Sequence, residues 1–190
     1  MKKAFFRSIA VLMILGLSVA IGMLYTNVYE KYERAVYPRE FCDVVTVYSE
    51  KFGVPEHIIY AVIKTESDFK SNAVSSAGAV GLMQITPDTF DWIAMKLNEQ
   101  GEFALMYDPE TNIRYGVYLL SFLKNEYENW DTVYAAYNAG FGNVDKWLAN
   151  TEYSDGNGVL KYIPFAETRA YVEKVNEAKN TYDRLYSSAE

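Results

Sequence analysis

The hydrophobic positions of this chain follow two different patterns. Residues 9–25 read IAVLMILGLSVAIGMLY, a run of seventeen positions without a charged side chain. From Glu40 onward, apolar residues instead recur at spacings of three and four, as in Ile113, Val117 and Leu120. That spacing is typical of helices with one buried face. The second pattern therefore predicts an all-α domain over most of the chain.

Start and stop signals divide this region into separate helices. Thr86 and Asp108 each precede a proline, and a capping residue followed by proline is typical of a helix start. Asp131 is the expected cap of the helix over 132–139. Gly53 and Gly140 are expected to end the helices that precede them. The expected helices are 40–52, 55–67, 87–98, 109–128, 132–139, 143–149 and 164–186, with a small β excursion near 75–85.

The uncharged run is long enough to cross a bilayer, which takes roughly 20 apolar residues and about 17 at the least. Lys2, Lys3 and Arg7 precede it, and basic flanks of this kind stay in the cytoplasm. The sequence therefore predicts a single-pass protein of the cell membrane whose globular part is extracytoplasmic. The expected divisions are an anchor over 1–26, a stalk over 27–39 and a domain over 40–190.

A removable signal peptide is the alternative interpretation of the same segment. Ser18-Val19-Ala20 resembles the small-x-small pattern of a cleavage site. The apolar run continues beyond this tripeptide to Tyr25, which favours an uncleaved anchor. Both interpretations place the globular part outside the cytoplasm.

Charge and composition exclude several classes of protein. The formal net charge is −7, and beyond Arg7 the chain carries 15 basic against 25 acidic side chains. An acidic chain of this kind is unsuited to nucleic acid, which requires a basic surface. A single cysteine, Cys42, and a single histidine, His57, leave no internal disulfide and argue against a multi-ligand zinc site or a hydrolytic triad. We expect no metal and no cofactor.

One carboxylate continues an apolar helix face. Ile58, Val62 and Glu66 are four residues apart each time, so they lie on the same side of the expected helix. Burial and the negative end of the helix both disfavour an ionised carboxylate and raise its pKa. A glutamic acid that is protonated near neutral pH can act as a general acid. The alternative is an ordinary helix-end glutamate paired with Lys64 or Lys70.

The loop that follows Glu66 is built from small residues. Positions 75–81 read SSAGAVG, which leaves space beside the acid and exposes backbone groups that can bond a polar ligand. A role in packing alone would place larger side chains there. A groove beside a neutral glutamic acid suits protonation of an ether-type oxygen, such as that of a glycosidic bond.

Three blocks of this sequence resemble the catalytic domain of the soluble lytic transglycosylases, which belongs to the lysozyme-like superfamily. The resemblance extends over roughly residues 40–186, and Phe141 replaces a proline expected in the family. The blocks are Glu66-Ser67 with Ser75 to Gln84, Ala135 to Gly140 with Val144 and Trp147-Leu148, and Ile163 to Val172.

This resemblance implies cleavage of the bond between N-acetylmuramic acid (MurNAc) and N-acetylglucosamine (GlcNAc) in peptidoglycan. Glu66 would protonate the leaving oxygen and then act as base while the sugar's own 6-hydroxyl closes on C1, leaving a 1,6-anhydro end. No convincing second carboxylate accompanies it: Asp68 faces away, and Asp88 and Asp91 suit a helix start. By matching position, the substrate-binding residues would be Ser75, Met83, Gln84, Tyr137, Asn138, Glu167 and Tyr171.

Two of these matched residues have specific expectations. The Tyr137 hydroxyl is expected to bond near the catalytic acid. Met83 is expected to form either a wall of the groove or part of the core.

The expected partners are peptidoglycan glycan strands and the membrane, with room for protein partners in a wall-spanning machine. Two other functions fit the same residues. One is a hydrolytic muramidase of the goose-lysozyme kind, and the other is a non-catalytic wall-binding scaffold.

Overall fold

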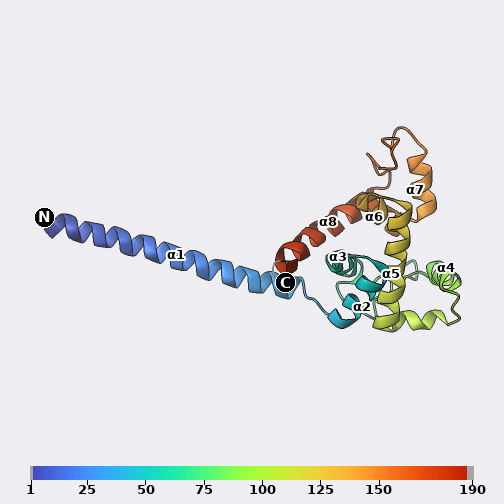
Figure 1. Ribbon diagram of the computed structural model, residues 1–190, viewed down its shortest axis with the longest axis horizontal. Coiled ribbons are helices and arrows are strands. Elements are labelled where there is room, and N and C mark those ends of the chain that lie inside the picture. The colour runs from blue at the N-terminus through green and yellow to red at the C-terminus, as the bar shows by residue number, and fades with distance from the viewer. Residues whose placement is uncertain (1, 188–190) are drawn as a thin grey trace. The chain divides into compact units, whose positions relative to one another are not determined.

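The structure, a computed structural model, describes residues 2–187 and divides the chain into two units, with the boundary between Pro38 and Arg39. The first unit is one continuous helix, α1 (Lys2–Val36) (Figure 1). Within the described residues it is the one helix that is long and apolar enough to cross a membrane. Leu12, Ile14 and Leu17 are each more than 60% exposed. An uninterrupted apolar surface of this kind suits contact with lipid.

The second unit is built from helices, which confirms the expected all-α class. Isolated bridges pair Val80 with Val74 and with Ile85, and these account for the expected β excursion; no β-strand forms among residues 2–187. The elements are α2 (Cys42–Phe52), α3 (Glu56–Ser67), α4 (Pro87–Leu97), the short 3₁₀ helix η1 (Phe103–Tyr107), α5 (Pro109–Glu126), α6 (Trp130–Ala139), α7 (Phe141–Leu148) and α8 (Ala166–Tyr186).

Two of the three expected helix caps are confirmed. The side chains of Thr86 and Asp108 each accept a hydrogen bond from the backbone N–H three residues later, at 3.2 and 2.8 Å. The expected cap at Asp131 is wrong. The Asn129 side chain instead accepts from the backbone N–H groups of Asp131 and Thr132, so α6 begins earlier than expected. Asn and Asp are about equally good caps, so the sequence alone did not separate them.

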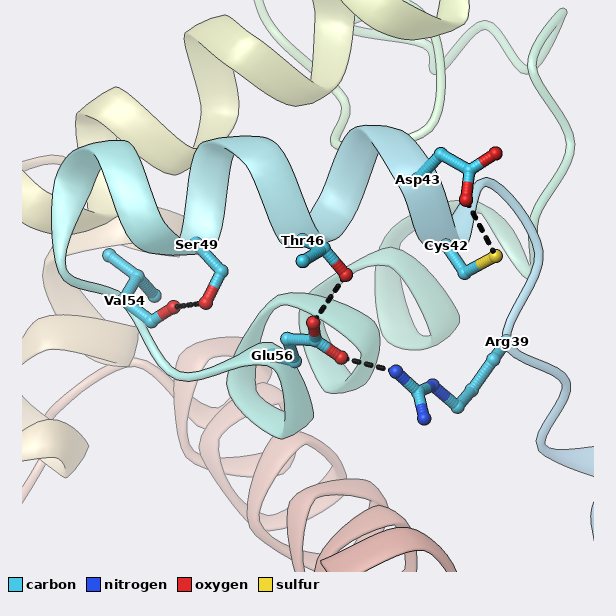
Figure 2. A network of polar contacts seen from close by, with 7 residues as sticks. All are labelled: Arg39, Cys42, Asp43, Thr46, Ser49, Val54 and Glu56. Carbon is cyan, nitrogen blue, oxygen red and sulfur yellow. Dashed lines mark hydrogen bonds and ion pairs between the residues drawn. The ribbon is translucent and has the colours of Figure 1, made fainter. Parts of the chain in front are cut away.

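Polar contacts between α2 and α3 fix where α3 begins (Figure 2). The Thr46 hydroxyl donates to Oε1 of Glu56 at 2.5 Å, and Arg39 forms an ion pair with the other oxygen of the same carboxylate. The Ser49 hydroxyl donates to the backbone oxygen of Val54 at 2.7 Å, which closes the turn before α3. The first turn of α3 is therefore held against α2.

The core of the second unit is built around α3. Ile59 and Ile63 are fully buried, and burial of each such side chain stabilises the fold by roughly 1.5–3 kcal/mol. α3 packs against α8 and α2, while α5 packs against α2 and α6 (Figure 1). The ring of Tyr60 on α3 stacks on that of Tyr182 on α8, with centroids 5.3 Å apart. This packing holds the far end of α3, where Glu66 lies, in a fixed position.

Candidate active site

Glu66 lies near the end of α3 and opens onto a groove of about 280 Å³. The small-residue loop forms one side of the groove, and the ends of α6 and α8 form the other side. Residues of α4 and α5 complete the lining. Its lining residues are Glu66, Ser75, Ser76, Ala77, Ala79, Gln84, Ile85, Thr86, Thr89, Leu119, Tyr137, Asn138 and Glu167.

The loop after α3 is tied to its neighbours by buried hydrogen bonds. The Ser67 hydroxyl donates to the backbone oxygen of Leu82 at 2.8 Å, so the residue beside the acid anchors the loop. Asn112, which is fully buried on α5, accepts from the backbone N–H of Met83 at 2.7 Å. Its amide nitrogen donates to the backbone oxygens of Val80 and Met106, both at 2.9 Å.

Sequence reasoning missed this role of Asn112. The available signal was a polar side chain at the helical spacing of Gly116 and Leu120, which belong to the buried face of α5. A buried amide has to satisfy its own hydrogen bonds, and here the backbones of the loop and of η1 supply the partners.

The Tyr171 hydroxyl donates to Oε1 of Glu66 at 2.7 Å. The Tyr137 hydroxyl, for which the resemblance implied a contact near the acid, donates instead to the backbone oxygen of Met83 at 2.7 Å. Both phenols are close enough to the acid to be affected by it. Burial first, and then the negative charge of Glu66, raise the pKa of Tyr137 and Tyr171 well above the ordinary value.

Burial raises the pKa of Glu66 to about 7, and the hydrogen bond from Tyr171 lowers it by a smaller amount. The residue keeps partial exposure to the groove, whereas its carboxyl group is enclosed by protein atoms. Removal from water disfavours the ionised form of a carboxyl group, as the sequence pattern predicted. A carboxyl group whose pKa lies near neutral pH can both give and accept a proton.

Five of the seven matched substrate-binding residues line the same groove as Glu66. Ser75 and Gln84 belong to the loop side, where the Gln84 amide donates to the backbone oxygen of Gly81 at 2.9 Å. Tyr137, Asn138 and Glu167 line the opposite side.

The other two matched residues lie behind the groove surface. Met83 is fully buried and packs so closely on Gly116 of α5 that a Cβ there would come within 2.3 Å of its sulfur. The structure therefore places Met83 in the core. Tyr171 is also buried and reaches the groove through its contact with Glu66.

The other nearby carboxylates differ from Glu66 in their surroundings. Asp68 is exposed and pairs with Lys64. Glu167 brings a second carboxylate to the groove lining. The sequence predicted this residue as a substrate-binding residue, and it is exposed in the first turn of α8. Asp88 lines an adjoining hollow. Across residues 2–187, no group of three or more His, Cys, Asp or Glu could hold a metal ion.

The sequence model of the transglycosylase SLT domain family matches residues 43–159, which include α3, the loop and α6. The chain belongs to this family. The match covers Glu66 and every groove-lining residue except Glu167.

Two curated relatives of this SLT domain illustrate its range. This chain is 32% identical over 170 residues to the soluble lytic murein transglycosylase of Escherichia coli K12. The alignment covers 87% of this chain and 25% of that protein. This chain is also 31% identical over 169 residues to membrane-bound lytic murein transglycosylase C of Pectobacterium atrosepticum, covering 76% of this chain and 47% of the relative. The chain thus spans less than half of each relative.

Solved structures show the same fold. The 70 kDa soluble lytic transglycosylase of Escherichia coli superposes with a TM-score of 0.73 at 31% identity, over 83% of this chain and 26% of the other. An inactive Glu-to-Gln mutant of the lytic transglycosylase Slt from Pseudomonas aeruginosa superposes with a TM-score of 0.71 at 30% identity, over 81% of this chain and 25% of the other.

Tyr171→Phe should shift the pH dependence of this SLT domain. The lost hydrogen bond lowers the pKa of Glu66, so its removal raises that pKa above about 7. Because a general acid must be protonated, the alkaline limb of kcat/KM moves to higher pH. A pH–rate profile of the detergent-solubilised chain measures the shift. A lower rate with an unmoved alkaline limb would contradict it.

Proposed function

We propose that this chain is a membrane-anchored peptidoglycan lytic transglycosylase that cleaves the β-1,4 bond between MurNAc and GlcNAc and leaves 1,6-anhydroMurNAc ends. The proposal depends chiefly on one observation: Glu66, with a pKa of about 7, lies enclosed at a groove in a chain of the SLT family. A carboxyl group in this state can serve as acid and then as base within one turnover.

In the proposed reaction, Glu66 gives its proton to the glycosidic oxygen as the bond from that oxygen to C1 breaks. The resulting carboxylate then accepts the proton of the 6-hydroxyl while O6 forms a new bond to C1. No water is consumed, and Glu66 ends protonated, as it began. Glu167, exposed on the opposite side of the groove, serves to bind the substrate rather than to attack it.

The relatives support this substrate class. The curated relatives are described as lytic murein transglycosylases, and one solved structure at a TM-score of 0.74 is a soluble lytic transglycosylase in complex with bulgecin A. The inactive Pseudomonas mutant carries Gln in place of a Glu, which supports an essential glutamate.

The N-terminal unit supports the membrane part of the proposal. α1 has an apolar, exposed surface, and Lys2, Lys3 and Arg7 at its start favour a cytoplasmic N-terminus. The anchor would be residues 1–26 and the stalk 27–39, with the catalytic domain over 40–190 at the outer face of the membrane. One relative is itself described as membrane-bound. A tethered domain of this kind also suits work beside protein partners in a wall-spanning machine.

Digestion of purified peptidoglycan by the full chain in detergent tests the reaction. We expect mass spectrometry to show muropeptides with 1,6-anhydro ends, each lighter by one water than the reducing product of hydrolysis. Products with reducing MurNAc ends would instead establish a hydrolytic muramidase. A chain that releases no products, but still sediments with the wall material, would be the non-catalytic scaffold.

A further inference from the structure

The last part of α1, residues 25–36, has one apolar and one polar side; we call this part the stalk helix. Successive side chains of an α-helix are turned by about 100°, which separates the two sides completely. The apolar side, called the tyrosine face below, consists of Tyr25, Val28, Tyr29, Tyr32, Ala35 and Val36. The polar side consists of Thr26, Asn27, Glu30, Lys31, Glu33 and Arg34. Tyr25 is 67% exposed, Val28 59% and Tyr32 65%, and an exposed apolar surface of this kind marks a contact surface.

The residue types on the tyrosine face suit the boundary between lipid and water. Tyrosine joins an apolar ring to a hydroxyl that needs a polar partner, and it is enriched where membranes meet water. The rings of Tyr25 and Tyr29 stack with their centroids 6.0 Å apart, and Tyr32 follows on the same side. Lys31 is exposed beside this face, and a lysine there can lay its alkyl chain on the lipid and reach the phosphates with its ammonium.

The apolar surface of α1 is longer on the tyrosine side than on the polar side. The helix is unbroken, so both sides begin with the same uncharged run (Figure 1). On the polar side the apolar surface ends with residue 25 and is ~26 Å long, whereas on the tyrosine side it continues to Tyr32 and reaches ~36 Å. The hydrocarbon core of a bilayer is about 30 Å thick. A helix that tilts toward its tyrosine side matches both lengths, and interfacial tyrosines and lysines are among the anchors that set such a tilt.

A second copy of the chain fits the tyrosine face less well than lipid does. Helices that pair along a seam favour branched aliphatic side chains and leucine at the contact positions. Three of the six positions here are tyrosines, and a seam between copies would bury their hydroxyls at a cost in free energy. The headgroup layer accepts the rings and leaves the hydroxyls hydrated.

We propose that the tyrosine face lies in the headgroup layer of the membrane and holds α1 tilted, with Tyr25, Tyr29 and Tyr32 toward the lipid. This inference rests on the membrane anchor of the proposed function and adds a one-sided lipid contact to it. The stalk helix then leans over the membrane surface, which brings the point where the catalytic unit begins closer to the lipid.

Spin labels at Asn27→Cys and Val28→Cys test the tilt in the full chain, reconstituted in phospholipid vesicles. Cys42→Ser first removes the exposed native thiol. Residue 27 is on the polar side and residue 28 on the tyrosine face. We expect a water-soluble nickel chelate to reach the label at 27 several-fold more readily than the label at 28, although residue 27 is nearer to the bilayer along the helix. Equal access, or easier access at 28, is the result of an upright helix and would overturn the proposal.

Dissolved oxygen and spin–spin broadening identify what covers residue 28. Oxygen concentrates in lipid, so a lipid contact gives high oxygen access without broadening. Broadening would establish a seam between two copies, and low access to both reagents would establish a contact with protein; either result overturns the proposal. A label at Leu17→Cys separates this from failure of the proposed anchor, because nickel access at residue 17 would mean that α1 does not cross the membrane.

Substitutions of the tyrosines test their part in the tilt. Tyr29→Ser with Tyr32→Ser should remove most of the difference in nickel access between the labels at 27 and 28. Tyr29→Trp with Tyr32→Trp should keep it, because tryptophan suits the same boundary. Tyr107→Ser, which removes an exposed tyrosine of the catalytic unit, is the matched control and should change nothing. A serine variant that keeps the full difference would show that the tyrosines do not hold the tilt.

Discussion

Glu66→Gln should lower the rate of strand cleavage by about a thousand-fold, the middle of the range for loss of a general acid or base. Glutamine is of similar size and can still accept the hydrogen bond from Tyr171, so the groove keeps its shape. It has no proton to give to the glycosidic oxygen. Release of anhydro-muropeptides by wild type and variant, followed by mass spectrometry, measures the loss. Asp68→Asn is the matched control: it makes the same chemical change at an exposed carboxylate two residues along, and it should retain wild-type activity.

The stability of the same variant relative to the wild type should increase as the pH rises. Glu66 has a pKa of about 7 in the folded protein and 4.5 in the unfolded chain, so the folded state holds this proton more tightly. Raising the pH from 4.5 to 7 therefore favours unfolding of the wild type. Relative to wild type, the free energy of unfolding of Glu66→Gln should rise over that window by up to about 3 kcal/mol and stay level above it. Denaturant titrations at pH 4 and pH 8 give the two values. If the free energies of unfolding of variant and wild type differ by the same amount at pH 4 and at pH 8, the acid ionises like a free glutamate.

Gly81→Ala should be the most destabilising single-methyl change in the loop. Gly81 has a φ of +83°, and a Cβ added there would lie 2.2 Å from the amide nitrogen of Asn112 and 2.5 Å from the backbone oxygen of Met106. Asn112 cannot move away without losing its bonds to the loop. The left-handed backbone costs about 1–2 kcal/mol and the overpacking about 1–3 kcal/mol.

Together these terms should lower the melting temperature of the catalytic unit by about 10 °C, given ~2–4 °C per kcal/mol for a unit of this size. Thermal unfolding of the solubilised chain by circular dichroism measures it. Gly78→Ala separates the two causes, because Gly78 has a similar φ of +76° and no atom within 4 Å of an added Cβ. It should show the backbone cost alone. Equal shifts for both variants would mean that the Asn112 contact relaxes at little cost.

The helices and their limits were largely readable from the sequence because their signals are local. Thr86 and Asp108 cap the helices that the cap-then-proline pattern assigned to them. The buried position of Glu66 also followed from its spacing with Ile58 and Val62.

Other features depend on contacts between distant residues, which no single segment encodes. The bond from Tyr171 to Glu66 joins residues 105 positions apart, so the sequence could not show that this tyrosine rather than Tyr137 reaches the acid. The two bonds of Asn112 to the loop, and its third bond to Met106 of η1, are hidden for the same reason. The rings of Trp92 on α4 and Phe141 on α7 lie 5.8 Å apart between centroids, although their separate positions in the sequence gave no sign of this contact.

The unbroken course of α1 limits the reach of the proposed enzyme. The helix continues from the apolar segment to Val36, and at about 1.5 Å per residue the part beyond Tyr25 is only ~17 Å long. The chain has just Tyr37 and Pro38 between that rod and the catalytic unit. With the apolar segment in the bilayer, a tether of this length limits how far the catalytic unit can move from the membrane. The proposed enzyme could then act on substrate strands only within that distance of the lipid.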